Sequence, residues 1–278
     1  MVKAAASQMN RLSPIFRIVL ATLVLPLIGL TTACATLPGD SGPDMRNPGP
    51  ENGYIPNSIG IVPPGRAYVE TSVEAARGPE DQSSRRFPVL VRTGLGENLE
   101  ARVVVGAYRY DEGDTERESG SGPLSFGVKY RISKGRGTGL TPAWGLQADI
   151  VVPGVFDEAF DGSVVSALTL NFDHTLSSKT LFSWNVGVLV PEDSQGDYFA
   201  QGFFTAAFAG FVSKNIQLYV DGALNFPSDG PGTDPAALLG GGGYFYLGNR
   251  VVIWAAYDFG LTSASPDGTA KLGISLAF

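Results

Sequence analysis

Charged residues recur inside segments of this chain that otherwise alternate between apolar and polar residues. In a β-strand every second side chain points to the same face, so such charges would gather on one face of a sheet. There they would either neutralise one another in a dry interior or form a polarised constriction that orients dipolar or charged solutes. The candidates for this interior lining are Glu70, Arg92, Glu100, Arg102, Lys129, Arg131, Asp149, Asp173, Asp221 and Asp258.

The first and second halves of this set differ in charge. Residues 70–131 mix acids and bases, and buried charges need partners. Mutual pairing is therefore the expected state of Glu70, Arg92, Glu100 and Arg102. The four aspartates that follow have no evident basic partners, so we expect them to form a solvated acidic wall.

His174 and Cys34 are the single histidine and the single cysteine of the chain. They exclude an intrachain disulfide and any metal site built from several cysteines or several histidines. A serine hydrolase in an outer-membrane barrel would need its histidine near the outer rim, whereas the pattern below places His174 beside a short turn at the opposite rim. We predict no enzymatic activity, no metal and no cofactor.

The composition is typical of short strands separated by turns. The chain has 278 residues, of which 36 are glycine, and only 17% are charged, against roughly 25% in soluble domains. This much glycine disfavours long helices. The net charge of −7 excludes the basic surface that binding to nucleic acid requires.

The N-terminus predicts export. Residues 1–17 carry Lys3, Arg11 and Arg17 without an acid, and an apolar run of residues 18–30 follows, too short to cross a bilayer. Residues 1–35 are predicted to be a signal peptide, in which Cys34 has two interpretations. Residues 33–35 fit an ordinary small-x-small cleavage site, or Cys34 is the lipidated first residue after a lipobox. The proline-rich residues 36–64 predict an extended, flexible lead-in on the periplasmic side.

From residue 65 to 278 the chain repeats about ten strand-like residues followed by turn residues. A membrane-spanning β-strand needs about 9–11 residues. The sequence therefore predicts an all-β fold, a transmembrane antiparallel up-and-down barrel of about twelve strands. The expected strands are roughly 66–75, 87–95, 99–109, 123–132, 140–152, 163–176, 181–190, 199–212, 216–226, 237–247, 251–261 and 269–278.

Short and long connections alternate along these strands, as in outer-membrane barrels. The long loops are 76–86, 110–122, 153–162, 191–198, 227–236 and 262–268. Apart from 76–86, which is mixed, they are acidic, with Arg117 as their one basic residue. The short turns are mostly basic. We therefore expect acidic loops outside the cell, and basic turns with both termini in the periplasm.

The alternation within strands separates an apolar face toward lipid from a polar interior. It is clean in 123–132, 163–176 and 216–226 and unresolved in 199–212 and 237–247, where Phe203-Phe204 and the Gly240–Gly243 run obscure it. A soluble sandwich with the alternation inverted is the alternative. The amphipathic last strand argues for the barrel, because its terminal Phe278 is typical of the signal read by the barrel-assembly machinery. The aromatic residues expected in the interfacial girdles are Trp144, Trp184, Tyr244, Tyr246, Tyr257 and Phe278.

Three segments carry a family resemblance: VPPGRAYVETSV (62–73), PVLVRTGLGENLEARVVV (88–105), and residues 225–278. Together they resemble the outer-membrane transporter family named for the meta-cleavage pathway of phenol degradation. The resemblance implies a barrel that passes small, often hydrophobic, molecules.

Two functions remain open from the sequence. One is a channel or transporter for small solutes, hydrophobic or aromatic ones included. The other is a closed barrel that acts as a structural or surface-display protein. The expected surroundings are outer-membrane lipid and lipopolysaccharide. The acidic loops either are simply solvated or contact lipopolysaccharide through divalent cations.

Overall fold

The computed structural model describes residues 42–53, 55–78, 82–113, 117–139, 141–155, 163–192, 197–226 and 235–278. The predicted signal peptide with Cys34, and residues 36–41 of the predicted lead-in, lie outside these ranges. Within them the chain is all-β. None of the described residues forms a helix long and apolar enough to cross a membrane.

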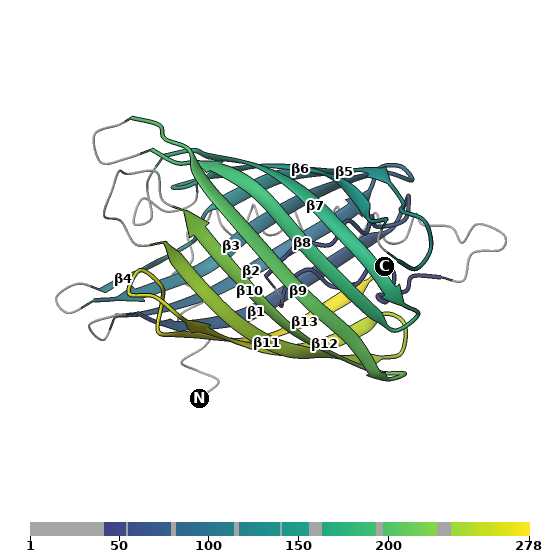
Figure 1. Cartoon of the computed structure of the whole chain (residues 1–278). Helices are drawn as coiled ribbons and strands as arrows, with labels where there is room; N and C mark the ends of the chain where they lie inside the picture. The colour runs from purple at the N-terminus through teal and green to yellow at the C-terminus, as the bar shows by residue number, and fades with distance from the viewer. Residues whose placement is uncertain are drawn as a thin grey trace. The chain divides into compact units, whose positions relative to one another are not determined.

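The described strands form one closed antiparallel barrel (Figure 1). Each wall strand pairs with its neighbours in the chain, and β1 pairs with β13 to close the ring. The strands are β1 (Ala67–Arg77), β2 (Ser83–Gly94), β3 (Leu99–Glu112), β4 (Arg117–Gly120), β5 (Leu124–Ser133), β6 (Ala143–Val152), β7 (Val165–Ser177), β8 (Thr180–Val190), β9 (Gln201–Ser213), β10 (Ile216–Phe226), β11 (Ala236–Leu247), β12 (Val251–Gly260) and β13 (Gly268–Ala277). All except β4 belong to the wall, which confirms the predicted twelve-stranded barrel.

The prediction missed the short strand β4. Residues 110–122 were expected to be a loop, but β3 continues to Glu112 and β4 pairs back onto it from Arg117 to Gly120. The two strands extend the β3–β5 connection as a two-stranded ribbon. Its residues are polar and glycine-rich, so the sequence lacks the alternation that marks a strand.

Side chains alternate between the lumen and the outer surface along the wall. On β10, Val220 is 60% exposed on the outside, whereas its neighbour Asp221 is 3% exposed on the inside. The two strands that the sequence left unresolved follow the same rule: β9 turns Phe204 outward and Thr205 inward, and β11 turns Tyr244 inward and Phe245 outward. The outer surface therefore presents large exposed apolar side chains, as a barrel in lipid requires.

The outer apolar band predicts a depth-dependent cost for charge. Val220→Arg, in the middle of β10, should lower the free energy of unfolding in lipid vesicles by about 2–4 kcal/mol. Val212→Arg, next to the β9–β10 turn, should cost only about 0–1 kcal/mol. Urea unfolding of both variants in vesicles tests this, and equal costs would contradict the proposed placement of the band.

Candidate functional site

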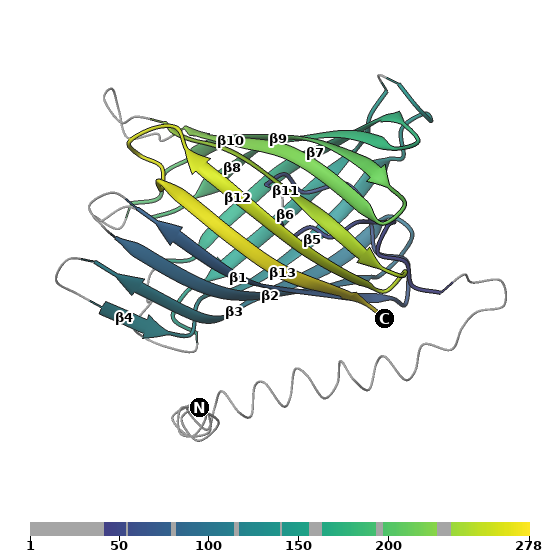
Figure 2. The same cartoon turned by 90° about the horizontal axis from the view of Figure 1, so that it is seen from below.

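A segment of the chain before β1 lies inside the barrel (Figures 1 and 2). We call residues 43–64 the lumen segment. It begins at the short-turn rim, where the Met45 amide donates to the carbonyl of Asn249, and it returns to that rim at Pro64, which bridges to Gly94. Met45 and Val62 are fully buried within it.

The predicted flexible lead-in is thus wrong for these residues. The prediction took the absence of strand periodicity to mean flexibility. Its described residues join no sheet ladder beyond the bridge at Pro64, yet side chains of the wall accept hydrogen bonds from six of its backbone amides. Because those partners are distant in sequence, no local pattern reveals them.

Glu51 of the lumen segment is the centre of a buried ion cluster. Its carboxylate lies 3.2 Å from Nη2 of Arg92 and 2.7 Å from Nη1 of Arg102, and it also pairs with Nζ of Lys129. These three bases come from β2, β3 and β5. All four side chains are at least nine-tenths buried. One carboxylate therefore joins three strands of the wall to the segment that crosses the lumen.

The wall supplies the remaining acids of this cluster. Arg92 lies 3.2 Å from Glu70 on β1 and 2.9 Å from Glu100 on β3. Glu70 also accepts hydrogen bonds from the backbone amides of Glu51 and Asn52, both at 2.9 Å. Glu100 accepts from the amide of Val62 at 2.9 Å. These acids bind the bases and the lumen segment together.

Two of the predicted lining residues, Asp149 and Arg131, lie at the edge of the cluster or away from it. Asp149 lies 3.8 Å from Nε of Arg102 and accepts a hydrogen bond from Gln147. Arg131 points to the short-turn rim, where it donates to the carbonyl of Glu97 and the side chain of Asn98.

The aspartates of the opposite wall also have partners. Asp173 accepts from Oγ of Ser58 at 2.7 Å and from the amide of Ile59 at 3.0 Å, and Asp221 accepts from the amide of Ile55 at 2.7 Å. The expectation of partnerless aspartates does not fit this geometry. The reason is that the lumen segment, whose position was not foreseen, provides their donors.

Asp258 has a basic partner that sequence reasoning overlooked. It lies 2.6 Å from Nζ of Lys271 on the next strand. Lys271 belongs to the polar face of the last strand, so its inward position was available from the alternation. Glu51 was also overlooked, and it has no comparable signal because it sits in an aperiodic segment.

The glycine run of β11 makes room for these side chains. A Cβ at Gly240 would collide with the carboxylates of Asp221 and Asp258, and one at Gly242 would collide with the ring of Tyr219. Side chains from β10 and β12 thus lie across the bare backbone of β11. This close approach explains the two glycines of the run that face the lumen, Gly240 and Gly242.

Aromatic side chains form the side of the lumen that faces Gly53. The side chains of Tyr244 and Trp254 are 2% and 1% exposed, and a Cβ on Gly53 would lie 2.8 Å from Oη of Tyr244. Gly53 also has φ +122°, which disfavours any other residue. Tyr244 and Tyr246 therefore belong to the interior, and their predicted place in an outer girdle is wrong.

An aromatic row does lie on the outside, across β6–β9. Phe172 stacks on Trp184 at 4.0 Å and on Trp144 at 6.3 Å between ring centroids. The indole nitrogen of Trp184 donates to Nε2 of His174 at 3.2 Å. The single histidine thus makes a contact on the outer surface, on the face opposite to Asp173.

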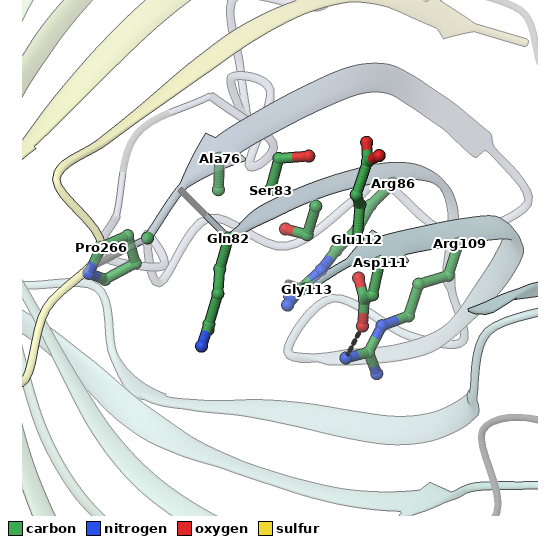
Figure 3. Close-up of a pocket in the computed structure, with 11 residues that line it drawn as sticks. Ala76, Gln82, Ser83, Arg86, Arg109, Asp111, Glu112, Gly113 and Pro266 are labelled. Atoms are coloured by element: carbon green, nitrogen blue, oxygen red, sulfur yellow. Dashed lines mark ion pairs between the residues drawn. The ribbon is translucent and has the colours of Figure 1, made fainter. Parts of the chain in front are cut away.

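Two cavities open at the two ends of the barrel. One, of about 170 Å³, lies between the lumen segment and β7–β11 at the short-turn end; Phe211, Gln217, Tyr244 and Tyr246 are among its lining residues. The other, of about 230 Å³, lies at the long-loop end (Figure 3). Figure 3 shows the ion pair of Arg109 with Asp111 along its wall, with Arg86 nearby.

The geometry and the fold together define a closed β-barrel of the outer-membrane type, whose lumen holds a segment of the chain that precedes β1. The family model described as "Putative MetA-pathway of phenol degradation" matches residues 60–278. The chain belongs to this family. No curated protein matches it.

Solved structures share the barrel at low sequence identity. The COG4313 outer membrane channel from Pseudomonas putida F1 aligns with a TM-score of 0.57 at 12% identity, over 81% of this chain and 99% of that one. The NanC porin aligns with a TM-score of 0.55 at 9% identity, over 75% and 98%. The KdgM porin gives 0.51 at 6% identity, over 76% and 99%. These similarities establish the fold.

Removal of the Glu51 carboxylate should release the lumen segment. Glu51→Ala leaves three buried bases without their shared acid, and breaking a buried ion pair on one side costs about 3–5 kcal/mol. Hydrogen–deuterium exchange should become faster in residues 43–64 while the barrel strands stay protected. Glu97→Ala is the matched control, because the Glu97 side chain is 82% exposed and its 3.7 Å pair with Lys134 is a surface contact. Unchanged protection in Glu51→Ala would contradict the central role of this residue.

The ion cluster of Glu51 also makes the binding of the lumen segment to the barrel wall depend on pH. Burial by itself would raise the pKa of Glu51, but the charges of Arg92, Lys129 and Arg102 outweigh it and lower the pKa from 4.5 to about 2. The stabilisation by Glu51 is therefore complete above pH 4.5 and is lost as the pH falls toward 2.

Trp254, which packs against Gly53, can report this transition by its fluorescence in a chain that lacks Trp144 and Trp184. The signal should stay constant down to pH 4 and change near pH 2. Glu51→Gln should lack this step. If the fluorescence transition of the protein with Glu51 in place had its midpoint at pH 4.5 or above, the neighbouring bases would not be holding the Glu51 carboxylate ionised.

Proposed function

We propose that this protein is an outer-membrane channel for small solutes, with its long loops outside the cell and its short turns and lumen segment on the periplasmic side. The observation that carries the proposal is the lumen segment itself. A barrel whose lumen is filled by the side chains of its own wall has no room there for a further segment of the chain. Here the wall leaves space for residues 43–64. Displacement of that segment would therefore open a path wide enough for a small molecule.

The attachments of the lumen segment favour a path along one side. The ion pairs of Glu51 connect the segment to β2, β3 and β5, and hydrogen bonds from its backbone to Glu70 connect it to β1. Toward β7, β8 and β10 it makes hydrogen bonds that involve Asp173, Asn185 and Asp221. The cavity of about 170 Å³ lies on this second side. We place the path between the lumen segment and β7–β11.

The solutes that suit this path are small molecules with an apolar or aromatic body. The rings of Phe211, Tyr244 and Tyr246 line the cavity, while Gln217 offers a polar contact. The family description, which refers to phenol degradation, supports the same class. The alternative, a closed barrel that displays its loops, is favoured by the number of contacts that hold the segment.

Single-channel recording in a planar bilayer distinguishes the two functions. The wild-type chain should give small conductance steps, and Glu51→Ala should give larger steps or more frequent openings, with Glu97→Ala as the unchanged control. Asp221→Asn should shift ion selectivity toward anions, because it removes a negative charge beside the path. If neither the wild type nor Glu51→Ala conducts, the channel proposal is wrong and the closed barrel is favoured.

A block experiment tests the solute class. Catechol added from the short-turn side should reduce the current, and Phe211→Ala should weaken this effect. Inositol, which is polyhydroxylated and not aromatic, serves as the control. Equal block by both compounds would contradict an aromatic preference.

A further inference from the structure

The outer surface of the barrel carries a basic sector at its long-loop end. Arg77 lies at the end of β1 and Arg85 near the start of β2, and both side chains are exposed. They share the outward face with Val73 and Phe87, which are 46% and 36% exposed. The alternation of the strands thus directs both guanidinium groups away from the lumen.

These arginines lie at the edge of the apolar band. Ala75 and Arg85 are partners across β1 and β2, and Arg85 and Tyr110 are partners across β2 and β3. The next outward residues toward the middle of the barrel are the apolar Val73 and Phe87. The boundary between apolar and charged side chains is where lipid headgroups meet a membrane protein.

Aromatic side chains flank the basic sector on both sides. The Arg85 guanidinium lies 5.7 Å from the centroid of the Tyr110 ring, and below it Phe87 contacts Tyr108 edge to face at 5.8 Å. On the other side, Tyr257 contacts Phe259 at 4.6 Å on β12. Between these groups stand the small exposed residues Ala75 and Ala270, which are register partners across β1 and β13. Figure 2 shows β13, β1, β2 and β3 side by side on this surface.

This sector does not share the excess of acids that the other long loops carry. Residues 76–86 contain three arginines and two acids, whereas the remaining long loops are acidic. Of these arginines, Arg77 and Arg85 belong to the outward face and Arg86 lines the lumen cavity. The acid nearest in the ladder, Glu112, is ion-paired with Arg117 of β4. A phosphate group that approaches the long-loop end therefore meets less repulsion at this sector than at the other long loops.

We propose that the outward face of β13, β1, β2 and β3 at the long-loop end binds a phosphate-bearing lipid of the outer leaflet. Arg77 and Arg85 contact the phosphates, since a guanidinium matches phosphate oxygens with two parallel hydrogen bonds. The aromatic side chains contact the region where the headgroup joins the acyl chains. The sequence-based expectation of lipopolysaccharide contacts at the acidic loops through divalent cations stays a prediction; the contacts proposed here are direct and lie on the basic sector. The proposal requires an outer-membrane location with the long loops outside, but it does not require conduction.

Arg85 and Arg86 form a matched pair for the test. They are neighbours in the chain, and both are exposed arginines of β2. Arg86 faces the lumen, where it lines the cavity of about 230 Å³ in Figure 3, whereas Arg85 faces outward. Substitution of each by alanine removes the same charge from opposite faces of one strand.

The measurement is the affinity of the folded full-length chain in detergent for diphosphoryl lipid A. Arg85→Ala should weaken binding about tenfold, as expected for the loss of one charge-assisted contact. The double variant Arg77→Ala/Arg85→Ala should weaken it further, and Arg85→Lys should restore part of the loss. Arg86→Ala should bind like the wild type. Heat-dependent migration on a denaturing gel shows that each variant is folded.

Three results would overturn the proposal. An equal loss in Arg86→Ala would show that total charge, and not the outward face, decides binding. Equal affinity for lipid A without phosphates would exclude the phosphate contacts. If inorganic phosphate displaced lipid A with the same dependence on Arg85, the ligand would be a free anion. Because the assay records no current, its failure and that of the channel proposal are distinguishable.

Discussion

The pairing of β1 with β13 is the contact on which the rest of the structure depends. In lipid an unpaired backbone group costs several kcal/mol, so a sheet with two free edges would not survive there. The pairing runs from Tyr68 opposite Ala277 to Arg77 opposite Gly268 and converts the sheet into a ring. Closure then separates the chain into an outer surface and a lumen, and every second side chain belongs to one or the other.

Inside the ring, charges need partners, and the lumen segment supplies many of them. The wall by itself places Arg92, Arg102 and Lys129 close together, with Glu70 and Glu100 beside Arg92. Glu51 adds the acid that touches all three bases. The hydrogen bonds to Asp173 and Asp221 hold the segment from the opposite side. The same contacts therefore stabilise the barrel interior and fill part of the lumen.

The two surfaces of one strand serve different purposes. Arg85 and Arg86 are identical in type and adjacent in sequence, yet Arg85 points outward beside Tyr110 and Arg86 lines the cavity at the long-loop end. Composition alone cannot assign such residues to a function. The side of the wall on which a charge lies decides whether it belongs to the outer surface or to the lumen.

The sequence by itself determined the barrel, the number of its wall strands and the face of most side chains, because a period of two and the spacing of turns are local properties. It also indicated that the acids and bases of the first strands would pair. It did not reveal that residues 43–64 enter the lumen, that Glu51 joins three bases, or that Tyr244 and Tyr246 face inward. Those features depend on contacts between residues far apart in the chain, such as Ile55 with Asp221. Only the closed tertiary structure brings such partners together, because an aperiodic segment has no pattern of its own and takes its conformation from the wall that surrounds it.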